Sequence, residues 1–389
     1  RQLPSAIASA NAGCPGSDRT GDMLNGYTAT SVDAYKAKVA EAEGLYGKVS
    51  ETTDDVISAQ KNTLANLYHD VLEINLPKDG KFYRVRCADN GTGQRRLQST
   101  INNDRLQMIS GNEGINVNSI FCYVDGGLLS YTKGQYINAY NFDAVDTKST
   151  VAFSKAYNGT LGQYNIKING SRYIYGKKAE IDSGTGTPSD QGYNWWLEEV
   201  NEIPVTITAA QYATFYAPYN VTLPAEGLTA YVVSEVASGY ATLEQIEGGV
   251  IPANTGVLLY ADVAEATTFN LTIGGEVTGV TSMMEGSAAS TYVTDESYVL
   301  GLVEGEVGLY TAKMTDNQWL NNGFKAYLPK TVGSNVQALR FNFGGETTAI
   351  DAVEVENANA PIYDLSGRRV LSTVKGGIYI QNGKKFIVK

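Results

Sequence analysis

Apolar positions along the chain change from a helical to a strand-like period near residue 80. In residues 31–77, apolar side chains recur every three or four positions in two stretches that a short link separates. This spacing places the apolar side chains on one face of a helix. The two stripes consist of Val32, Tyr35, Val39, Ala42 and Tyr46, and of Val56, Leu64, Leu67, Val71 and Leu72. Residues 31–77 are therefore predicted to form an α-helical hairpin.

The segment before this hairpin, residues 1–30, is rich in Gly, Ser and Ala and contains Pro15. Its composition predicts a partly helical connector. The chain opens at Arg1 without a signal peptide, so we expect a processed fragment of a longer protein.

Residues 80–200 contain a weak threefold repeat with strand-like alternation. Each unit of roughly 40 residues has an opening strand, an aromatic or Arg-led strand and a closing aromatic strand. The opening segments are KFYRVRC, GLLSY and QYNIKI, and the closing segments are SIFCYV, TVAFSKA and NWWLEEV. Phe121, Phe153 and Trp196 are expected at comparable closing positions. Three such units close a β-trefoil, whereas three propeller blades do not close a ring.

The trefoil pattern resembles the ricin-type β-trefoil family, and this resemblance implies sugar binding. The family's Gln-x-Trp motif is replaced in the third unit by Tyr193-Asn194-Trp195, and the first two units contain no Trp.

Residues 203–346 alternate short strand-like segments with clusters of Gly, Pro, Asn and Asp. Many short antiparallel strands of this kind predict a β-sandwich or an open barrel. The segments GGVIPANTGVLLY and NGFKAYLP resemble a module found in secreted multidomain proteins of Bacteroidales bacteria, where it often follows a trefoil. The chain as a whole is thus predicted to be mainly β and multidomain.

The last segment, residues 350–389, is predicted to be a small β unit with tight turns. It resembles the C-terminal sorting domain of the type IX secretion system. The matching residues are Tyr363, Asp364, Gly367, Arg368, Gly377, Tyr379, Lys384 and Lys385. The resemblance implies contact with a secretion machinery and a location outside the cell or on the outer-membrane surface. The alternative is a strand pair that completes the preceding sandwich.

The charge balance excludes several kinds of partner. The formal net charge is −11 and the pI is about 4.8, whereas a nucleic-acid-binding chain needs a basic face. The same balance argues against docking on anionic lipid. No apolar run approaches the length of a membrane span.

The three cysteines, Cys14, Cys87 and Cys122, do not form a disulfide framework, because their number is odd. Cys87 and Cys122 lie in apolar strand contexts, so either a disulfide between them or two buried free thiols is consistent with the sequence. No spacing typical of a metal site occurs, and no cofactor is predicted.

Candidate catalytic groups are few. His69 is the sole histidine, it lies within the second predicted helix, and no nucleophile motif accompanies it. Glu198 and Glu199 are neighbours in a strand, so their side chains point to opposite faces. The segment Ser189–Trp195 is an imperfect copy of a sialidase Asp-box. We therefore predict that this chain is not an enzyme, although a catalytic domain could precede it.

Tyrosines of the predicted trefoil are the candidate ligand-binding residues. An exposed aromatic ring offers a flat apolar face on which a sugar can stack. The candidates for contact with a glycan are Tyr131, Tyr136, Tyr173 and Tyr175, and Tyr140 belongs to the same group. The alternative is that these tyrosines are ordinary half-buried strand residues.

Several functions fit this set of features. The first is a non-catalytic, glycan-binding accessory region of a Bacteroidales surface protein. The second is a structural or adhesive module that binds protein. An enzyme within these residues lacks a nucleophile–base set, and a trefoil protease inhibitor is a further possibility.

Overall fold

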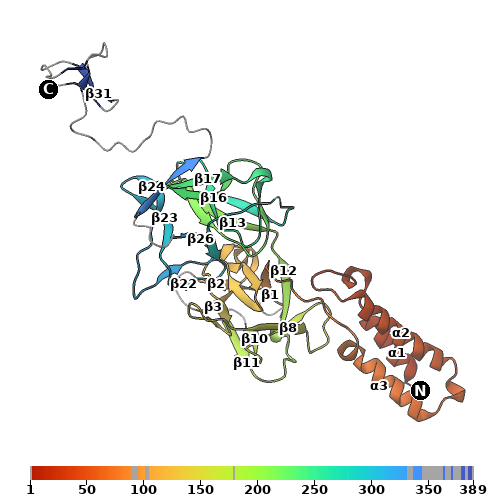
Figure 1. Ribbon diagram of the computed structural model, residues 1–389. Coiled ribbons are helices and arrows are strands. Elements are labelled where there is room, and N and C mark those ends of the chain that lie inside the picture. Colours follow the sequence, from red (N-terminus) through yellow and green to blue (C-terminus); the bar gives the residue numbers. More distant parts are fainter. Residues whose placement is uncertain are drawn as a thin grey trace. The chain divides into compact units, whose positions relative to one another are not determined.

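The computed structural model describes residues 2–89, 95–100, 105–177, 180–277, 279–330 and 336–343, together with four short strands between residues 362 and 387. The protein is mainly β, with helices near the N-terminus (Figure 1). It divides into two compact units, Arg1–Asn342 and Phe343–Lys389.

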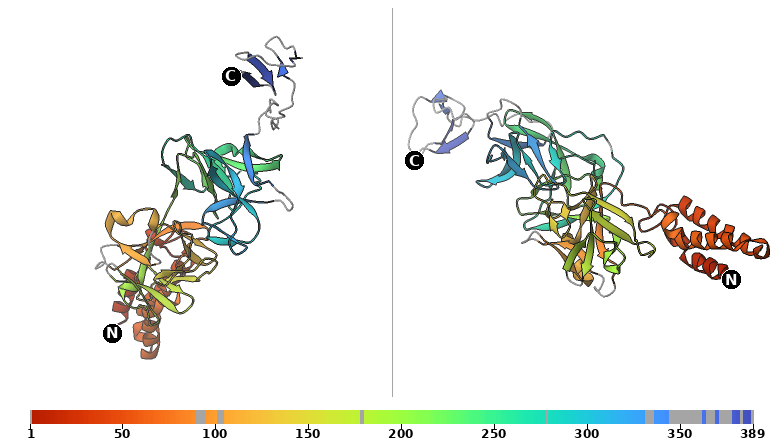
Figure 2. Two further views of the ribbon diagram at one scale, coloured as in Figure 1. Left: turned by 90° about the vertical axis from the view of Figure 1, so that its left-hand side faces the viewer. Right: turned by 90° about the horizontal axis from the view of Figure 1, so that it is seen from below.

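Three α-helices in the described residues pack against one another (Figures 1 and 2). They are α1 (Leu3–Gly13), α2 (Ala29–Tyr46) and α3 (Asp54–Asp70). The Thr28 and Thr53 hydroxyls cap α2 and α3 by accepting hydrogen bonds from backbone N–H groups of the first turn. The predicted hairpin corresponds to α2 and α3. The segment expected to be a partly helical connector contains a third helix, α1, whose Leu3, Ile7 and Ala10 form a buried stripe.

The region after the helices is a β-trefoil, and its described part holds twelve strands. They are β1 (Lys81–Cys87), β2 (Arg96–Ser99), β3 (Leu106–Ile109), β4 (Phe121–Val124), β5 (Gly127–Ser130), β6 (Ile137–Asn138), β7 (Asn141–Phe142), β8 (Val151–Lys155), β9 (Tyr164–Ile168), β10 (Arg172–Lys177), β11 (Glu180–Gly184) and β12 (Asn194–Glu199). Each predicted repeat supplies four of these strands, one more than the three expected.

Six of the trefoil strands form a ring. In it, β12 pairs with β1 and β9, β1 with β4, β4 with β5, and β8 with β9. A hydrogen bond from the Val151 N–H to the Gly126 carbonyl, 2.7 Å long, joins β8 to the start of β5. The hairpins β2–β3, β6–β7 and β10–β11 lie one in each repeat.

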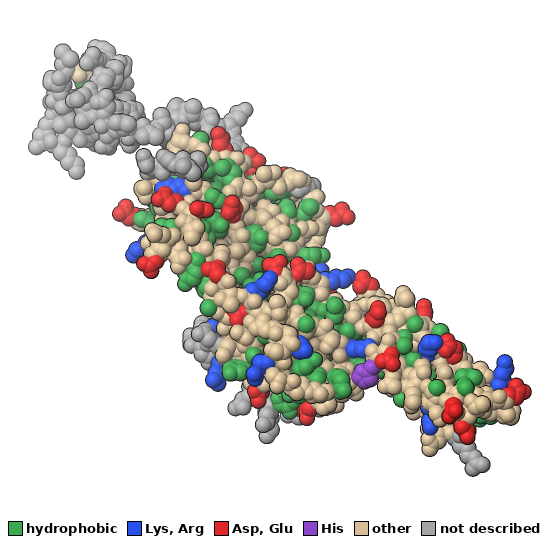
Figure 3. Space-filling model, turned by 60° about the horizontal axis from the view of Figure 1, so that its bottom comes forward, with side chains coloured by type: hydrophobic (Ala, Val, Ile, Leu, Met, Phe, Trp, Pro, Cys, Tyr) green, Lys and Arg blue, Asp and Glu red, His purple; other side chains and the backbone are tan. Residues whose placement is uncertain are grey.

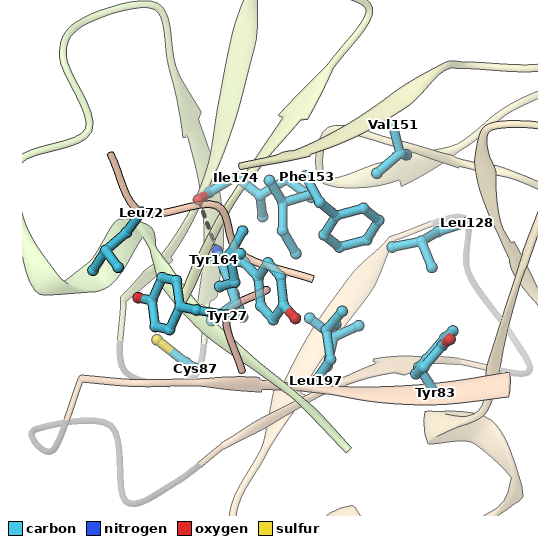
Figure 4. Close-up of a cluster of buried hydrophobic side chains, with 14 of the residues drawn as sticks. Tyr27, Leu72, Tyr83, Cys87, Leu128, Val151, Phe153, Tyr164, Ile174 and Leu197 are labelled. Atoms are coloured by element: carbon cyan, nitrogen blue, oxygen red, sulfur yellow. Dashed lines mark hydrogen bonds between the residues drawn. The ribbon is translucent and has the colours of Figure 1, made fainter. Parts of the chain in front are cut away.

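The trefoil interior is continuous with the helical core. Figure 4 shows Tyr27 and Leu72, which flank the helices in the sequence, beside Tyr164 of β9. Trp195 is fully buried there and donates its indole N–H to the Ile174 carbonyl at 3.1 Å. Phe121 and Phe153 are buried at closing positions as expected. Trp196 is only half-buried, because neighbouring strand residues face opposite ways and Trp195 takes the core position.

The following region is an antiparallel sandwich built from two main sheets. Its strands are β13 (Glu202–Ile207), β14 (Tyr212–Phe215), β15 (Val221–Thr222), β16 (Thr229–Ala237), β17 (Tyr240–Gln245), β18 (Val250–Ile251), β19 (Val257–Tyr260), β20 (Thr267–Ile273), β21 (Glu285–Ser287), β22 (Thr291–Val293), β23 (Ser297–Val303), β24 (Glu306–Thr311), β25 (Trp319–Asn321), β26 (Lys325–Pro329) and β27 (Ala338–Phe343).

The smaller sheet has the order β13-β20-β15-β18, and it shares a buried apolar cluster with one face of β14, β16 and β19. The larger sheet, β14-β19-β16-β17-β27-β24-β23-β26-β21, curves until β26 contacts β14. It thereby encloses a second apolar cluster and resembles a barrel. Strands β22 and β25 form a separate ribbon.

Trefoil and sandwich share a packed contact. Phe82, Tyr131 and Phe324 pack together, with ring centroids 4.8–5.9 Å apart. The Asp146 carboxylate accepts hydrogen bonds from the Thr291 hydroxyl and the Tyr292 N–H, at 2.6 and 3.2 Å. These contacts join the two regions within one compact unit.

All three cysteines are free thiols, so a disulfide between Cys87 and Cys122 is excluded. Cys87 faces the core that the trefoil shares with the helices, whereas Cys122 faces the core that the trefoil shares with the sandwich. Burial raises the pKa of the Cys122 thiol well above its usual value.

The second unit contains a four-stranded antiparallel sheet of order β29-β28-β30-β31. Its strands are β28 (Ile362–Tyr363), β29 (Arg369–Val370), β30 (Ile378–Gln381) and β31 (Lys384–Ile387). Tyr363, Tyr379, Lys384 and Lys385 of the predicted sorting signal lie on these strands. Asp364, Gly367, Arg368 and Gly377 lie outside the described residues.

Candidate functional site

The hairpin β10–β11 of the third repeat presents two of the predicted tyrosines on one face. Tyr173 and Tyr175 are two positions apart on β10, so their side chains project to the same side of the hairpin. Across the ladder, Tyr173 lies opposite Gly184 and Tyr175 opposite Asp182. Both tyrosines are half-buried, and Asp182 is exposed.

Tyr193 completes this group from the short 3-10 helix η6 (Gln191–Tyr193) that precedes β12. Its ring centroid lies 4.7 Å from that of Tyr175 and 6.4 Å from that of Tyr173, and both pairs meet edge to face. This arrangement is the favoured one for aromatic side chains. We call Tyr173, Tyr175 and Tyr193 the tyrosine cluster.

Two glycines make room for the tyrosine cluster. A Cβ atom at Gly184 would overlap the Tyr193 phenol oxygen, and one at Gly192 would overlap the ring of Tyr175. Larger residues at these positions would push the rings apart. The close spacing of the three tyrosines therefore depends on two small residues that come from β11 and η6.

Acidic side chains lie beside the tyrosine cluster. The exposed Asp190 caps η6, where its carboxylate accepts a 2.8 Å hydrogen bond from the Gly192 N–H. Burial, followed by the negative charges of Asp190 and Asp89, raises the pKa of Tyr175. The phenol, already protonated at neutral pH at its ordinary pKa of about 10, is thus still harder to ionise. The cluster combines apolar ring surface with phenol donors and carboxylate acceptors.

Lys167 of β9 covers part of the Tyr173 ring. Its ammonium nitrogen lies 5.1 Å from the ring centroid, within the range of a cation–π contact. Because Lys167 pairs with Tyr173 across strands β9 and β10, this contact follows directly from the strand register. It helps to fix the orientation of the Tyr173 ring.

The other two predicted tyrosines are packing residues. Tyr131 donates its phenol O–H to the Pro204 carbonyl at 2.8 Å, and its ring packs on Phe82 and Phe324. Tyr136 is only 7% exposed and belongs to the same apolar cluster. The sandwich covers the Tyr131 ring, and the Tyr136 ring is buried in the shared apolar cluster, so neither offers a face on which a sugar could stack. The structure thus brings together Tyr173 and Tyr175 but not Tyr131 and Tyr136.

Two members of the site, Tyr193 and Asp190, were missed in the sequence. Both lie in the segment Ser189–Trp195, whose likeness to an Asp-box is too poor to predict a role. A usable signal is the pair of glycines, Gly184 and Gly192, that allows aromatic rings to approach closely. That signal acquires meaning only when the strand pairing is known.

The polar residues considered as catalytic candidates have structural contacts. His69 packs edge to face on Tyr68, with ring centroids 5.1 Å apart. Its carbonyl accepts a 2.7 Å hydrogen bond from the Lys155 ammonium group, which binds the exposed end of α3. Glu198 is held between Arg86 and Arg96.

Among the residues that the structure describes, no three His, Cys, Asp or Glu side chains gather into a group that could hold a metal ion. None of the described helices has the length and apolar character that spanning a membrane requires.

Comparison with known proteins gives distant structural similarities. No family model and no curated protein matched the sequence. A GlcNAcα1-4Gal-releasing endo-β-galactosidase from Clostridium perfringens aligns with 16% identity over 31% of this chain and 32% of its own, with a TM-score of 0.26. The chain thus spans about a third of that enzyme.

Two further solved structures also align with this chain. Cry35Ab1 aligns with 8% identity over 65% of this chain and 88% of its own, with a TM-score of 0.25. A mosquitocidal holotoxin aligns with 8% identity over 68% and 46% of the two chains, with a TM-score of 0.24.

Proposed function

We propose that this chain is a non-catalytic, glycan-binding region, and that the tyrosine cluster is its sugar-binding surface. The observation that carries the proposal is the convergence of Tyr173, Tyr175 and Tyr193 beside the exposed carboxylates of Asp182 and Asp190. A sugar ring has an apolar C–H face and a rim of hydroxyl groups. Aromatic rings bind the first, and charged acceptors form strong hydrogen bonds with the second.

A glycan array screened with the full chain tests this proposal. Tyr175→Ala and Tyr193→Ala are each expected to weaken binding of the retained glycans about tenfold, which corresponds to about 1.4 kcal/mol. Tyr46→Ala is the matched control, because it removes an equally large ring that is 49% exposed on a helix. The proposal fails if no glycan is retained, or if the control and the cluster variants lose affinity equally.

A structural or adhesive module is the second candidate. The packed contact of Phe82, Tyr131 and Phe324 favours it, because a spacer benefits from regions that do not move independently. An empty glycan array together with binding to a surface protein would favour this candidate over the first.

We further propose that the chain is delivered to the surface of a Bacteroidales cell by the type IX secretion system, through the sheet at its C-terminus. Strand β31 pairs with β30, so removal of residues 384–389 leaves β30 without this partner. The deletion is expected to trap the protein in the periplasm, as measured by cell fractionation. If the sheet only stabilises the chain, the deletion will lower the melting temperature and leave surface delivery at normal levels, which would contradict the proposal.

A further inference from the structure

Charge is distributed unevenly between the trefoil and the sandwich. Residues 80–200 carry 13 Lys and Arg against 11 Asp and Glu, whereas residues 201–343 carry 4 against 14. On the face shown in Figure 3, acidic side chains dominate over the sandwich and basic ones gather over the trefoil. The acidic net charge of the chain therefore conceals a region that is slightly basic.

Three arginines of the trefoil surround a single carboxylate. On β1, Arg84 lies opposite Glu198 of β12, and Arg86 lies opposite both Trp196 of β12 and Arg96 of β2. Because Arg84 and Arg86 are two positions apart on β1, both side chains project to the outer face of the trefoil ring. We call Arg84, Arg86 and Arg96 the arginine cluster.

The carboxylate of Glu198 is fully engaged by two members of this cluster. One oxygen accepts hydrogen bonds from Arg86 Nε at 2.6 Å and Arg96 Nη2 at 3.0 Å, and the other accepts one from Arg96 Nε at 2.7 Å. Burial by itself raises the pKa of Glu198, but the bonds from Arg96 and Arg86 outweigh it and lower the pKa below its usual value. Glu198 is therefore ionised at neutral pH, and three cations face one anion.

Several N–H groups of the cluster remain available. Arg84 donates its Nε–H to the Ser119 hydroxyl at 3.0 Å, and Arg86 uses its Nε–H on Glu198. In the described part of the chain, the terminal nitrogens of Arg84 and Arg86 meet no acceptor, and the sole buried side-chain polar atom without a partner is Arg95 Nε. The terminal nitrogens of Arg84 and Arg86 therefore reach solvent.

The cluster is held in place before any ligand arrives. The side chains of Arg96 and Arg86 are 11% and 23% exposed. The Arg86 guanidinium carbon lies 5.8 Å from the ring centroid of Trp196, whose ring also contacts Arg19 at 5.1 Å. Arg86 thus lies near both Trp196 and Glu198, so little side-chain entropy remains to be lost on binding.

A polar groove adjoins the cluster at the exit from the trefoil. Arg84 lines this groove together with Asn116, Asn201 and Asn270. The carboxylates Glu199 and Glu202 also line it, and Glu199 is paired with Lys81 at 3.4 Å. The Asn116 amide is already bonded to Gln98, Asn118 and Glu113. The groove therefore offers ligand hydroxyls the other two asparagines and the carboxylates that line it together with Arg84.

We propose that the arginine cluster binds an oxyanion of an acidic polysaccharide, a sulfate ester or a carboxylate, through the terminal N–H groups of Arg84 and Arg86. Guanidinium groups recognise such oxyanions by paired hydrogen bonds. The adjoining groove receives the hydroxyl groups of the sugar that carries the anion. This site shares no residue with the tyrosine cluster, so an experiment can contradict one proposed binding site without contradicting the other.

The test compares dextran sulfate with uncharged dextran, which share the same sugar backbone, as ligands for the full chain at about 0.15 M salt. The chain is expected to bind dextran sulfate and not dextran. Polygalacturonate and inorganic sulfate as further probes separate recognition of carboxylate from that of sulfate. Absence of binding to every anionic probe would overturn the proposal.

Variants locate the binding. Arg84→Gln leaves the hydrogen bonds of Glu198 intact. The double variant Arg84→Gln/Arg86→Gln removes the free terminal N–H groups of both arginines. Its affinity for dextran sulfate is expected to fall about tenfold. Arg340→Gln removes an exposed arginine from the sandwich and is expected to change nothing. Equal losses in Arg340→Gln and Arg84→Gln would show that net charge alone is responsible and would overturn the proposal. Tyr175→Ala is expected to leave dextran sulfate binding unchanged.

A charge-preserving pair separates geometry from charge. Arg84→Lys/Arg86→Lys keeps both cations but loses the planar fork, and it is expected to recover only part of the affinity. Melting temperatures of all variants identify any that lose their fold. The single variant Arg84→Gln then decides the outcome, because the one hydrogen bond it removes is the bond to Ser119. Unchanged affinity in a folded Arg84→Gln would contradict the assignment.

Discussion

The second and third repeats of the trefoil both carry paired tyrosines near their hairpins, yet the pairs have opposite environments. Tyr131 and Tyr136 precede β6–β7 and lie in the apolar cluster shared with the sandwich. Tyr173 and Tyr175 lie on β10–β11, half-buried, beside Tyr193. The same residue type, at related places in one repeated motif, is covered by packing in one repeat and partly exposed to solvent in the other.

Close backbone approach explains why the second repeat is covered. Gly134 has a positive φ of 62°, and a Cβ there would lie 2.7 Å from the Gly323 Cα. The Ser290 N–H donates to the Gly134 carbonyl at 2.6 Å. Two glycines thus allow the sandwich to reach the trefoil surface, where Phe324 contacts Tyr131. Nothing in the third repeat's own sequence distinguishes its tyrosines as open.

The largest decrease in the free energy of unfolding is expected from Phe324→Ala, which removes the aromatic residue of the sandwich that packs on Tyr131. Phe324 is 3% exposed, and its loss leaves a cavity beside Phe82 and Tyr131. The free energy of unfolding is expected to fall by about 3–5 kcal/mol. Urea denaturation measures it, with Tyr193→Ala as the comparison in the third repeat.

Tyr193→Ala is expected to lower the free energy of unfolding by less than Phe324→Ala does, because Tyr193 is only half-buried. An equal or larger loss in Tyr193→Ala would mean that the tyrosine cluster is itself a core element. The contrast between the two repeats would then be incorrect.

A smaller effect is expected from Tyr131→Phe, which keeps the ring and removes the bond to the Pro204 carbonyl. The substitution leaves the Pro204 carbonyl without its hydrogen-bond donor inside a packed contact. The free energy of unfolding is therefore expected to fall by about 1–2 kcal/mol. Tyr173→Phe makes the same chemical change in the third repeat, and it is expected to stay within about 0.5 kcal/mol of the parent chain. Melting temperatures of the two variants provide the comparison, and equal shifts would contradict it.

Local patterns of apolar and polar residues predict most of the secondary structure and its threefold repetition. The spacing of Val32, Tyr35 and Val39 predicts a helix because their side chains must share one face, and α2 follows it. The three strand patterns of residues 80–200 correspond to three sets of four strands. Such features depend on contacts between residues close in sequence, which a local pattern records.

Which surfaces meet could not be predicted from such local patterns. Strand alternation gives every strand two faces, but it does not say which face a distant segment will cover. Tyr131 is covered because Pro204 and Phe324 reach it from far along the chain. Cys87 and Cys122 remain apart because adjacent strands direct them into different cores. The tyrosine cluster likewise required η6 to bring Tyr193 against β10, a contact that depends on the folding of the whole repeat.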